Sequence, residues 1–144
     1  AYGWWSKERA ADRSKLVLVG ESLGCAVAID LAARVPVDGI VLQSSFTTAW
    51  DMAKILIPFG LIQPVLGVRF DSAAKIGKIT CPKLFIHGDR DEIVPFRLGR
   101  KLYDLAPPPK EFYEVSGAGH NDLIWVAGSE YVKRLRAFLS HLAP

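Results

Sequence analysis

The feature that most constrains the fold is a short apolar segment, residues 16–19, that ends in Gly-x-Ser-x-Gly and runs directly into a helical pattern. A strand that turns at once into a helix holds the residue at the turn in a strained backbone conformation and exposes its side chain. We therefore expect Ser22 to be a nucleophile. Gly20 and Gly24 are expected where neighbouring segments approach too closely for a side chain. The N-terminus of the following helix favours negative charge that develops nearby.

Composition and length predict an ordinary globular domain. The 144 residues suit one core, half of them are hydrophobic and 23% are charged. The net charge of +3 is mild, and the small basic group Lys133, Arg134 and Arg136 is typical of a solvated helix face, so we expect no nucleic-acid partner. Cys25 and Cys81 have no metal-ligand spacing and form no disulfide framework. Residues 117–119 lack the third glycine and the following helix of a dinucleotide-binding loop, so we expect neither a metal nor an organic cofactor.

The termini and apolar segments bear on location. The first residues lack the basic and apolar regions of a signal peptide, which favours a cytoplasmic protein without establishing its compartment. The most apolar stretch, residues 55–68, is too short to span a bilayer and contains two prolines. A contact of this stretch with a membrane surface stays open as an alternative.

Strand and helix patterns alternate along the chain. Near-continuous apolar runs predict buried strands at residues 16–19, 39–43, 83–87 and 112–115. Helical patterns lie at residues 23–34, 96–105 and 129–142. This alternation predicts an α/β fold with a parallel sheet and right-handed crossovers.

A long connection follows the second predicted strand. Residues 45–80 contain helical pieces at 50–56 and 71–76, separated by prolines and glycines. Such an insertion commonly forms a lid or a pocket wall, and plain packing over the sheet is the alternative. We interpret the whole chain, residues 1–144, as one domain that contains this lid-like insertion.

Three polar clusters follow strands of the predicted sheet, where open parallel sheets bind ligands. They bring a hydroxyl at Ser22, carboxylates at Asp89 and Asp91, and an imidazole at His120 to one edge. A serine hydroxyl needs a base, and a carboxylate that holds the histidine tautomer completes that arrangement. His87, which follows the third strand, fits a structural role better than a metal site.

The segments GESLG, HGDRDEIVP and GAGHND resemble the nucleophile, acid and base motifs of the α/β-hydrolase superfamily. Arg69-Phe70-Asp71 and the stretch 75–82 are similar to a branch of compact serine hydrolases related to bud-emergence proteins, which includes lipid- and protein-acyl (thio)esterases. The resemblance covers residues 16–139. A serine at the elbow points to acyl transfer, since epoxide- and haloalkane-cleaving relatives need an acid there.

The resemblance implies roles for individual residues. Ser22 is the nucleophile, His120 the base and Asp91 the acid, because the family places its acid before an x-x-V-P turn. Asp89 is then expected to accept hydrogen bonds from loop amides. The backbone N–H of Leu23 is one oxyanion donor.

The resemblance also implies a partial α/β-hydrolase fold of about four parallel strands in sequential order. The family has further strands before the nucleophile strand, and a loop there supplies a second oxyanion donor. With only about 15 preceding residues, we expect an exposed edge at residues 16–19 and an apolar patch covered by a missing N-terminal segment or by a second copy.

These observations predict a serine hydrolase that cleaves a carboxylic ester or thioester, with a small hydrophobic acyl substrate. A non-catalytic binding fragment and a peptidase of the same fold remain alternatives. The sequence leaves open the acyl length, the leaving group, the oligomeric state and the activity of the chain by itself.

Overall fold

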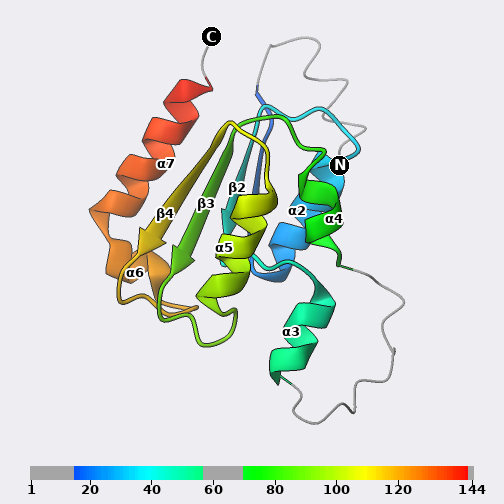
Figure 1. Ribbon diagram of the computed structural model, residues 1–144. Helices are drawn as coiled ribbons and strands as arrows, with labels where there is room; N and C mark the ends of the chain where they lie inside the picture. The colour runs from blue at the N-terminus through cyan, green and yellow to red at the C-terminus, as the bar shows by residue number, and fades with distance from the viewer. Residues whose placement is uncertain (1–14, 57–69, 143–144) are drawn as a thin grey trace.

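A computed structural model describes residues 15–56 and 70–142 of the chain. Its centre is a four-stranded parallel sheet in the order β1-β2-β3-β4 (Figure 1). The strands are β1 (Val17–Glu21), β2 (Gly39–Gln43), β3 (Lys83–Gly88) and β4 (Lys110–Val115). Each strand follows its neighbour in sequence, which confirms the predicted fold class.

Helices cover both faces of this sheet (Figure 1). The helices of the described residues are α2 (Leu23–Ala32), α3 (Ala49–Leu56), α4 (Ser72–Ile76), α5 (Phe96–Leu105), α6 (Leu123–Ala127) and α7 (Ser129–His141). Helices α2, α4 and α5 pack on one face, and α6 and α7 pack on the other. The α2 and α4 helices are joined by Lys75, whose Nζ lies 2.7 Å from Asp30 Oδ1.

Alternating side chains of the central strands supply two hydrophobic cores. Ile40 and Leu42 of β2 point into the cluster under α2, α4 and α5, whereas Val41 points into the cluster under α6 and α7. Every residue of β2 and β3 is buried. This two-sided burial explains why these strands are continuous apolar runs, as expected for a parallel sheet with both faces covered.

The outer strands are less enclosed. β1 ends the sheet within the described part of the chain, and Val19 is 67% exposed on the face that α7 covers elsewhere. In β4 the side chains of Glu111 and Glu114 are exposed. The exposed edge predicted at residues 16–19 is therefore present among the described residues. What covers it stays a prediction.

The segments on either side of residues 57–69, in the connection between β2 and β3, lie side by side. Thr48 and Asp71 form an antiparallel bridge, and Ala49 N–H donates to Phe70 O at 3.2 Å. Residues 57–69, the middle of the predicted 45–80 insertion and most of the apolar stretch, lie outside the described residues. Its role as a lid stays a prediction.

The predicted elements match the observed ones closely, with small differences at their ends. The strand predicted at 16–19 continues to Glu21, the one at 83–87 includes Gly88, and the one at 112–115 begins at Lys110. The helix predicted at 23–34 ends at Ala32, and α6 was not predicted. Within residues 15–56 and 70–142, no helix is long and apolar enough to cross a membrane.

Candidate active site

Ser22 stands at a sharp turn between β1 and α2. Its backbone has φ 51° and ψ −119°, a conformation that is rare for a residue with a side chain. The Ser22 N–H donates to Gln43 O of β2 at 2.9 Å, which ties the turn to the neighbouring strand. The Ser22 side chain makes no capping hydrogen bond to α2, so its hydroxyl is not engaged by the helix. This is the geometry expected of a nucleophile elbow.

The two glycines of the motif differ in what they permit. A Cβ on Gly20 would lie 2.7 Å from Cys25 Cα and 2.7 Å from Gly24 O, both backbone atoms that cannot move independently. A Cβ on Gly24 would have no described atom within 4 Å. Among residues 15–56 and 70–142, the expected close approach is therefore present at Gly20 and absent at Gly24, because only Gly20 lies under the first turn of α2.

The buried Cys25 side chain links the elbow to the neighbouring strand β2. Its Sγ donates to Gly20 O at 3.2 Å and to Gln43 O at 3.1 Å, and the residue is 1% exposed. Burial raises the pKa of the Cys25 thiol well above its usual range, so the thiolate is strongly disfavoured. Cys25 is therefore a packing residue beside the candidate nucleophile.

Asp91 and His120 form a buried acid–base pair. His120 lies in the turn after β4 and Asp91 in the loop after β3, and their Nδ1 and Oδ2 atoms are 2.7 Å apart. The Asp91 side chain has no exposed surface. A carboxylate at Nδ1 selects the Nδ1–H tautomer, which leaves the lone pair on Nε2. His120 is thus oriented to accept a proton at Nε2.

The loop after β3 holds Asp91 in its ionised form. Ile93 N–H and Val94 N–H donate to Asp91 Oδ1 at 3.0 and 2.7 Å. Burial by itself would raise the pKa of Asp91, but hydrogen bonds from His87, His120 and the Val94 amide outweigh it and hold that pKa well below its usual range. A permanent carboxylate next to the imidazole stabilises the imidazolium that forms when His120 accepts a proton.

Asp89 and His87 support this loop in other ways. Asp89 Oδ1 accepts from Gly117 N–H at 2.6 Å, which confirms the expected bond to a loop amide. His87 is 1% exposed, and its Nε2–H donates to Val94 O at 2.9 Å. Its ring packs on α5, where a Cβ on Gly99 would lie 2.1 Å from His87 Nδ1. These contacts fit the structural role predicted for His87.

Ser22, the remaining predicted catalytic residue, lies at the same carboxyl end of the sheet as Asp91 and His120, but it follows the outer strand β1. Ser22 follows β1 and His120 follows β4, so β2 and β3 lie between their strands. Among the described residues, no hydrogen bond joins the Ser22 hydroxyl to His120. The Leu23 N–H, the first of α2, likewise donates to no described residue. Asp91 and His120 therefore form a hydrogen-bonded pair, and Ser22 lies in a separate turn at the same carboxyl end of the sheet.

Sequence reasoning missed the backbone donors that hold the acid. The Ile93 and Val94 amides follow Asp91 at the spacing of an Asx turn, a local signal that was present in the sequence. It also missed the acceptor for the elbow, Gln43 O, which depends on strand pairing. In the described part of the chain, no group of three or more His, Cys, Asp or Glu residues could hold a metal ion.

The chain is similar in sequence to known proteins over most of its length. No protein-family profile matches the chain. It is 34% identical over 143 residues to the uncharacterized protein Rv2307c of Mycobacterium tuberculosis, covering 99% of this chain and 51% of that protein. It is 35% identical over 130 residues to human alpha/beta hydrolase domain-containing protein 17C, covering 90% of this chain and 37% of that protein. The chain therefore spans about half, or less, of these relatives.

Solved structures share the fold. The Pyrococcus furiosus esterase Pf2001 matches with a TM-score of 0.76 at 21% identity, over 98% of this chain and 59% of that one. The esterase domain of a Rhodothermus marinus protein matches with a TM-score of 0.67 at 20% identity, over 92% of this chain and 65% of that one. A sequential parallel sheet with a serine elbow and a buried Asp–His pair is typical of hydrolases with an α/β core. The chain belongs to the α/β-hydrolase superfamily.

Proposed function

We propose that the protein is a serine hydrolase that cleaves carboxylic esters or thioesters through an acyl-enzyme on Ser22. The observation that carries the proposal is the buried 2.7 Å contact between His120 Nδ1 and Asp91 Oδ2, at the edge of the sheet where the Ser22 elbow lies. A histidine held in this tautomer beside an ionised carboxylate is what activation of a serine hydroxyl requires.

The proposed reaction has two steps. In the first, Ser22 Oγ attacks the carbonyl carbon while His120 Nε2 takes the hydroxyl proton, and the same proton then leaves with the alcohol or thiol as the ester bond breaks. In the second, His120 takes a proton from water as its oxygen attacks the acyl-enzyme, and returns that proton to Ser22 Oγ. The products are the carboxylic acid and the alcohol or thiol, and His120 and Ser22 are regenerated.

Leu23 N–H is the proposed donor to the oxyanion. It is the first amide of α2, adjacent to the nucleophile, and it has no acceptor among the described residues. An amide at a helix N-terminus carries partial positive charge, which suits the negative oxygen of the tetrahedral intermediate. Exposed apolar side chains close in sequence to two site residues, Leu23 directly after Ser22 and Ile93 two residues after Asp91, favour a substrate with an apolar portion.

A fluorophosphonate probe tests the proposal, because it reacts only with an activated serine. We expect labelling of Ser22 in the folded chain, loss of labelling in Ser22→Ala and a large reduction in His120→Ala. Ser116→Ala is the matched control, since Ser116 is an exposed serine on the loop after β4. Absence of labelling in a chain shown to be folded by circular dichroism would favour a non-catalytic binding module.

A substrate panel separates the chemical alternatives. Short-chain esters, long-chain thioesters and aminoacyl amides share the acyl-enzyme step and differ in the leaving group. We expect turnover of esters or thioesters to exceed turnover of amides by at least about tenfold, because alcohols and thiols leave more readily than amines. Faster turnover of the amides would assign the site to a peptidase.

A further inference from the structure

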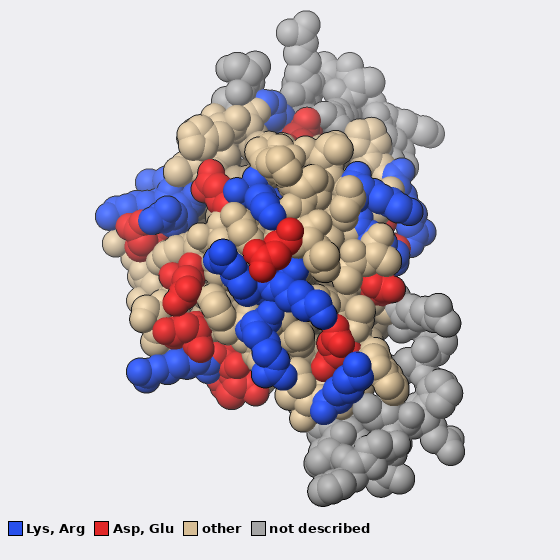
Figure 2. Space-filling view, viewed as in Figure 1, with Lys and Arg blue, Asp and Glu red and all other residues tan. Residues whose placement is uncertain are grey.

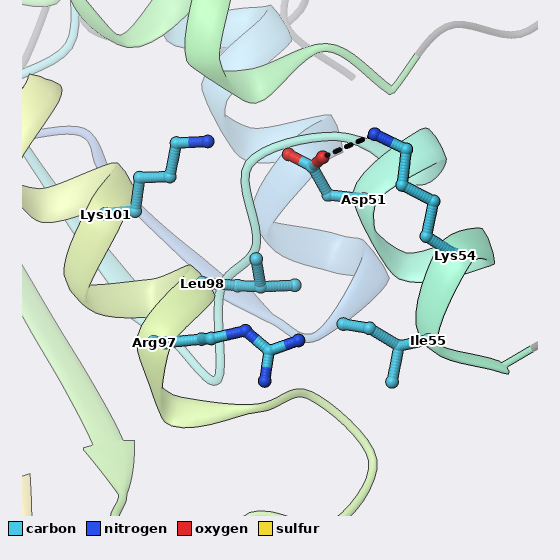
Figure 3. A pocket seen from close by; sticks show the side chains of 6 residues that line it. All are labelled: Asp51, Lys54, Ile55, Arg97, Leu98 and Lys101. Carbon is cyan, nitrogen blue, oxygen red and sulfur yellow. Dashed lines mark ion pairs between the residues drawn. The ribbon is translucent and has the colours of Figure 1, made fainter.

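A pocket of about 460 Å³ lies between α3 and α5, and the assigned site residues take no part in it. Figure 3 shows side chains from the two helices reaching toward each other across it. Its lining comprises Asp51, Lys54 and Ile55 from α3 and Arg97, Leu98 and Lys101 from α5. The lining thus combines an apolar floor with three cations and one carboxylate, and it carries a net positive charge.

The single carboxylate in the pocket is already engaged. Asp51 Oδ2 accepts from Thr47 Oγ1 at 2.5 Å, and Lys54 Nζ lies 3.7 Å from Asp51 Oδ1. The hydrogen bond from Thr47 is the largest influence on Asp51 and lowers its pKa, so the group is ionised at neutral pH. The charges of Lys101 and Lys54 also lower the pKa of Asp51, so this one carboxylate offsets part of the charge of both lysines. With Arg97 as the third cation, the lining keeps a net positive charge.

Arg97 and Lys101 have no carboxylate within ion-pair distance among the residues that the structure describes. By contrast, the neighbouring Arg100 pairs with Asp104 at 3.6 Å and lies over the ring of Tyr103. Figure 2 shows lysine and arginine side chains gathered over the region of α5. Arg97 also stands in the first turn of its helix, where a cation is opposed by the helix dipole. A pocket in which three cations face one carboxylate is suited to an anion.

One hydrophobic cluster links the wall of the pocket to the elements that carry the candidate active site. Leu98 and Ile55 pack in one hydrophobic cluster with Val94, whose amide holds Asp91, and with Ala26 of α2, the helix behind Ser22. The chain passes from Asp91 through Pro95 directly into α5. A group bound between α3 and α5 therefore lies beside the edge at which the ester would be cleaved.

We infer that the pocket between α3 and α5 is a subsite for a phosphate group carried by the ester or thioester substrate. Arg97 offers a planar set of donors that matches two phosphate oxygens, and Lys101 and Lys54 add point charges. Leu98 and Ile55 accommodate the carbon chain between the phosphate and the scissile bond. This inference rests on the proposed function, which it extends to a substrate class.

Phosphate-bearing esters come from two sources, a phospholipid-like molecule in an aggregate or a soluble phosphorylated ester. We would compare butyrylglycerol with butyrylglycerol phosphate, which share the scissile ester and differ only in the phosphate. A second pair, palmitoylglycerol and its phosphate in mixed micelles, represents the lipid source. The pair in which the phosphate ester is hydrolysed with the larger gain in kcat/KM over the neutral ester identifies the source. A gain for the phosphate ester in either pair supports the subsite.

The variant Arg97→Gln/Lys101→Gln should lower kcat/KM for the phosphate ester by about tenfold or more, mainly through KM, and change the neutral ester by less than about twofold. Arg100→Gln/Lys110→Gln is the matched control. It removes the same charge from α5 and its surroundings, but Arg100 pairs with Asp104 and Lys110 Nζ donates to Tyr103 O, outside the pocket. The control should change both esters by less than about twofold.

Binding of glycerol phosphate to the Ser22→Ala chain, measured by calorimetry, separates the subsite from the chemistry. Binding that weakens about tenfold with Arg97→Gln/Lys101→Gln supports the subsite even if no ester is hydrolysed, in which case the proposed function fails alone. Hydrolysis without preference for phosphate, with binding equally weak in the parent and double-variant chains, would overturn the subsite alone. Absence of both hydrolysis and binding would overturn the two together.

Discussion

The two halves of the candidate site are built in different ways. On the acid–base side, the loops after β3 and β4 enclose Asp91 completely, and side-chain and amide hydrogen bonds fix it against His120. On the nucleophile side, the elbow is held by the Ser22 N–H bond to Gln43 O and by the buried Cys25 thiol, and no hydrogen bond among the described residues fixes the Ser22 hydroxyl. This elbow lies at the end of an edge strand on which Val19 is 67% exposed. The acid–base half is therefore stabilised by hydrogen bonds within and between the loops after β3 and β4. The nucleophile half depends instead on how closely β1 and α2 pack.

The largest expected effect is on the acid–base half. Asp91→Asn keeps the shape of the side chain but lets its amide donate to His120 Nδ1, which places the ring proton on Nε2. His120 could then no longer accept the serine proton, so we expect kcat to fall by about 10³–10⁴-fold. Asp89→Asn is the control, because Asp89 bonds Gly117 instead, and a loss below about tenfold is expected there. Equal losses in the two variants would mean that Asp91 is not the acid.

The same substitution has a pH signature in the free energy of unfolding. Because the pKa of Asp91 is lower in the folded chain than in the unfolded chain, its ionised form stabilises the fold at neutral pH. That contribution is fully present above about pH 4, the ordinary range of the group, and it is lost as pH falls through the folded pKa. Urea titrations should show the Asp91→Asn chain less stable by about 2 kcal/mol at pH 7, with a smaller gap at pH 3.

The nucleophile half is tested by its two glycines. Gly20→Ala places a methyl group 2.7 Å from backbone atoms of α2, so we expect a loss of about 1–3 kcal/mol in the free energy of unfolding. Gly24→Ala meets no described atom and lies in a helix, so a change between zero and a gain of about 1 kcal/mol is expected. Urea unfolding of both chains gives the comparison. A loss at Gly24 as large as at Gly20 would contradict the packing described for the elbow.

Sequence reasoning reached the strands and the polar edge because their signals are local. Residues 39–43 form an apolar run long enough for one strand, and α5 begins after Pro95 and ends before a run of prolines, so its bounds were predicted in full. Asp91 was separated from Asp89 only by the resemblance to a family. The amides of Ile93 and Val94 supply the physical reason for that choice.

The features that could not be predicted from the sequence depend on short elements or on contacts between segments distant in the chain. The α6 helix has five residues and too few turns to show a helical period. Within the described part of the chain, the close approach expected at Gly24 is not found, because spacing alone does not say which side of the turn lies under α2. Arg97 and Lys101 resemble an ordinary solvated helix face until α3 is placed opposite them. The distinction between a charged surface and a charged pocket exists only in three dimensions.

The smallest expected effect concerns the open edge of the nucleophile half. Val19→Lys replaces an apolar side chain that is 67% exposed, so within the described contacts it removes little buried surface. We expect the free energy of unfolding to change by less than about 0.5 kcal/mol. We also expect the melting temperature to be independent of protein concentration in both chains. A loss above about 1.5 kcal/mol would show that another segment covers this face. A melting temperature that also rises with concentration only in the parent chain would show that this cover is a second copy. In that case the nucleophile half is completed by another molecule, whereas the acid–base half is complete within the chain.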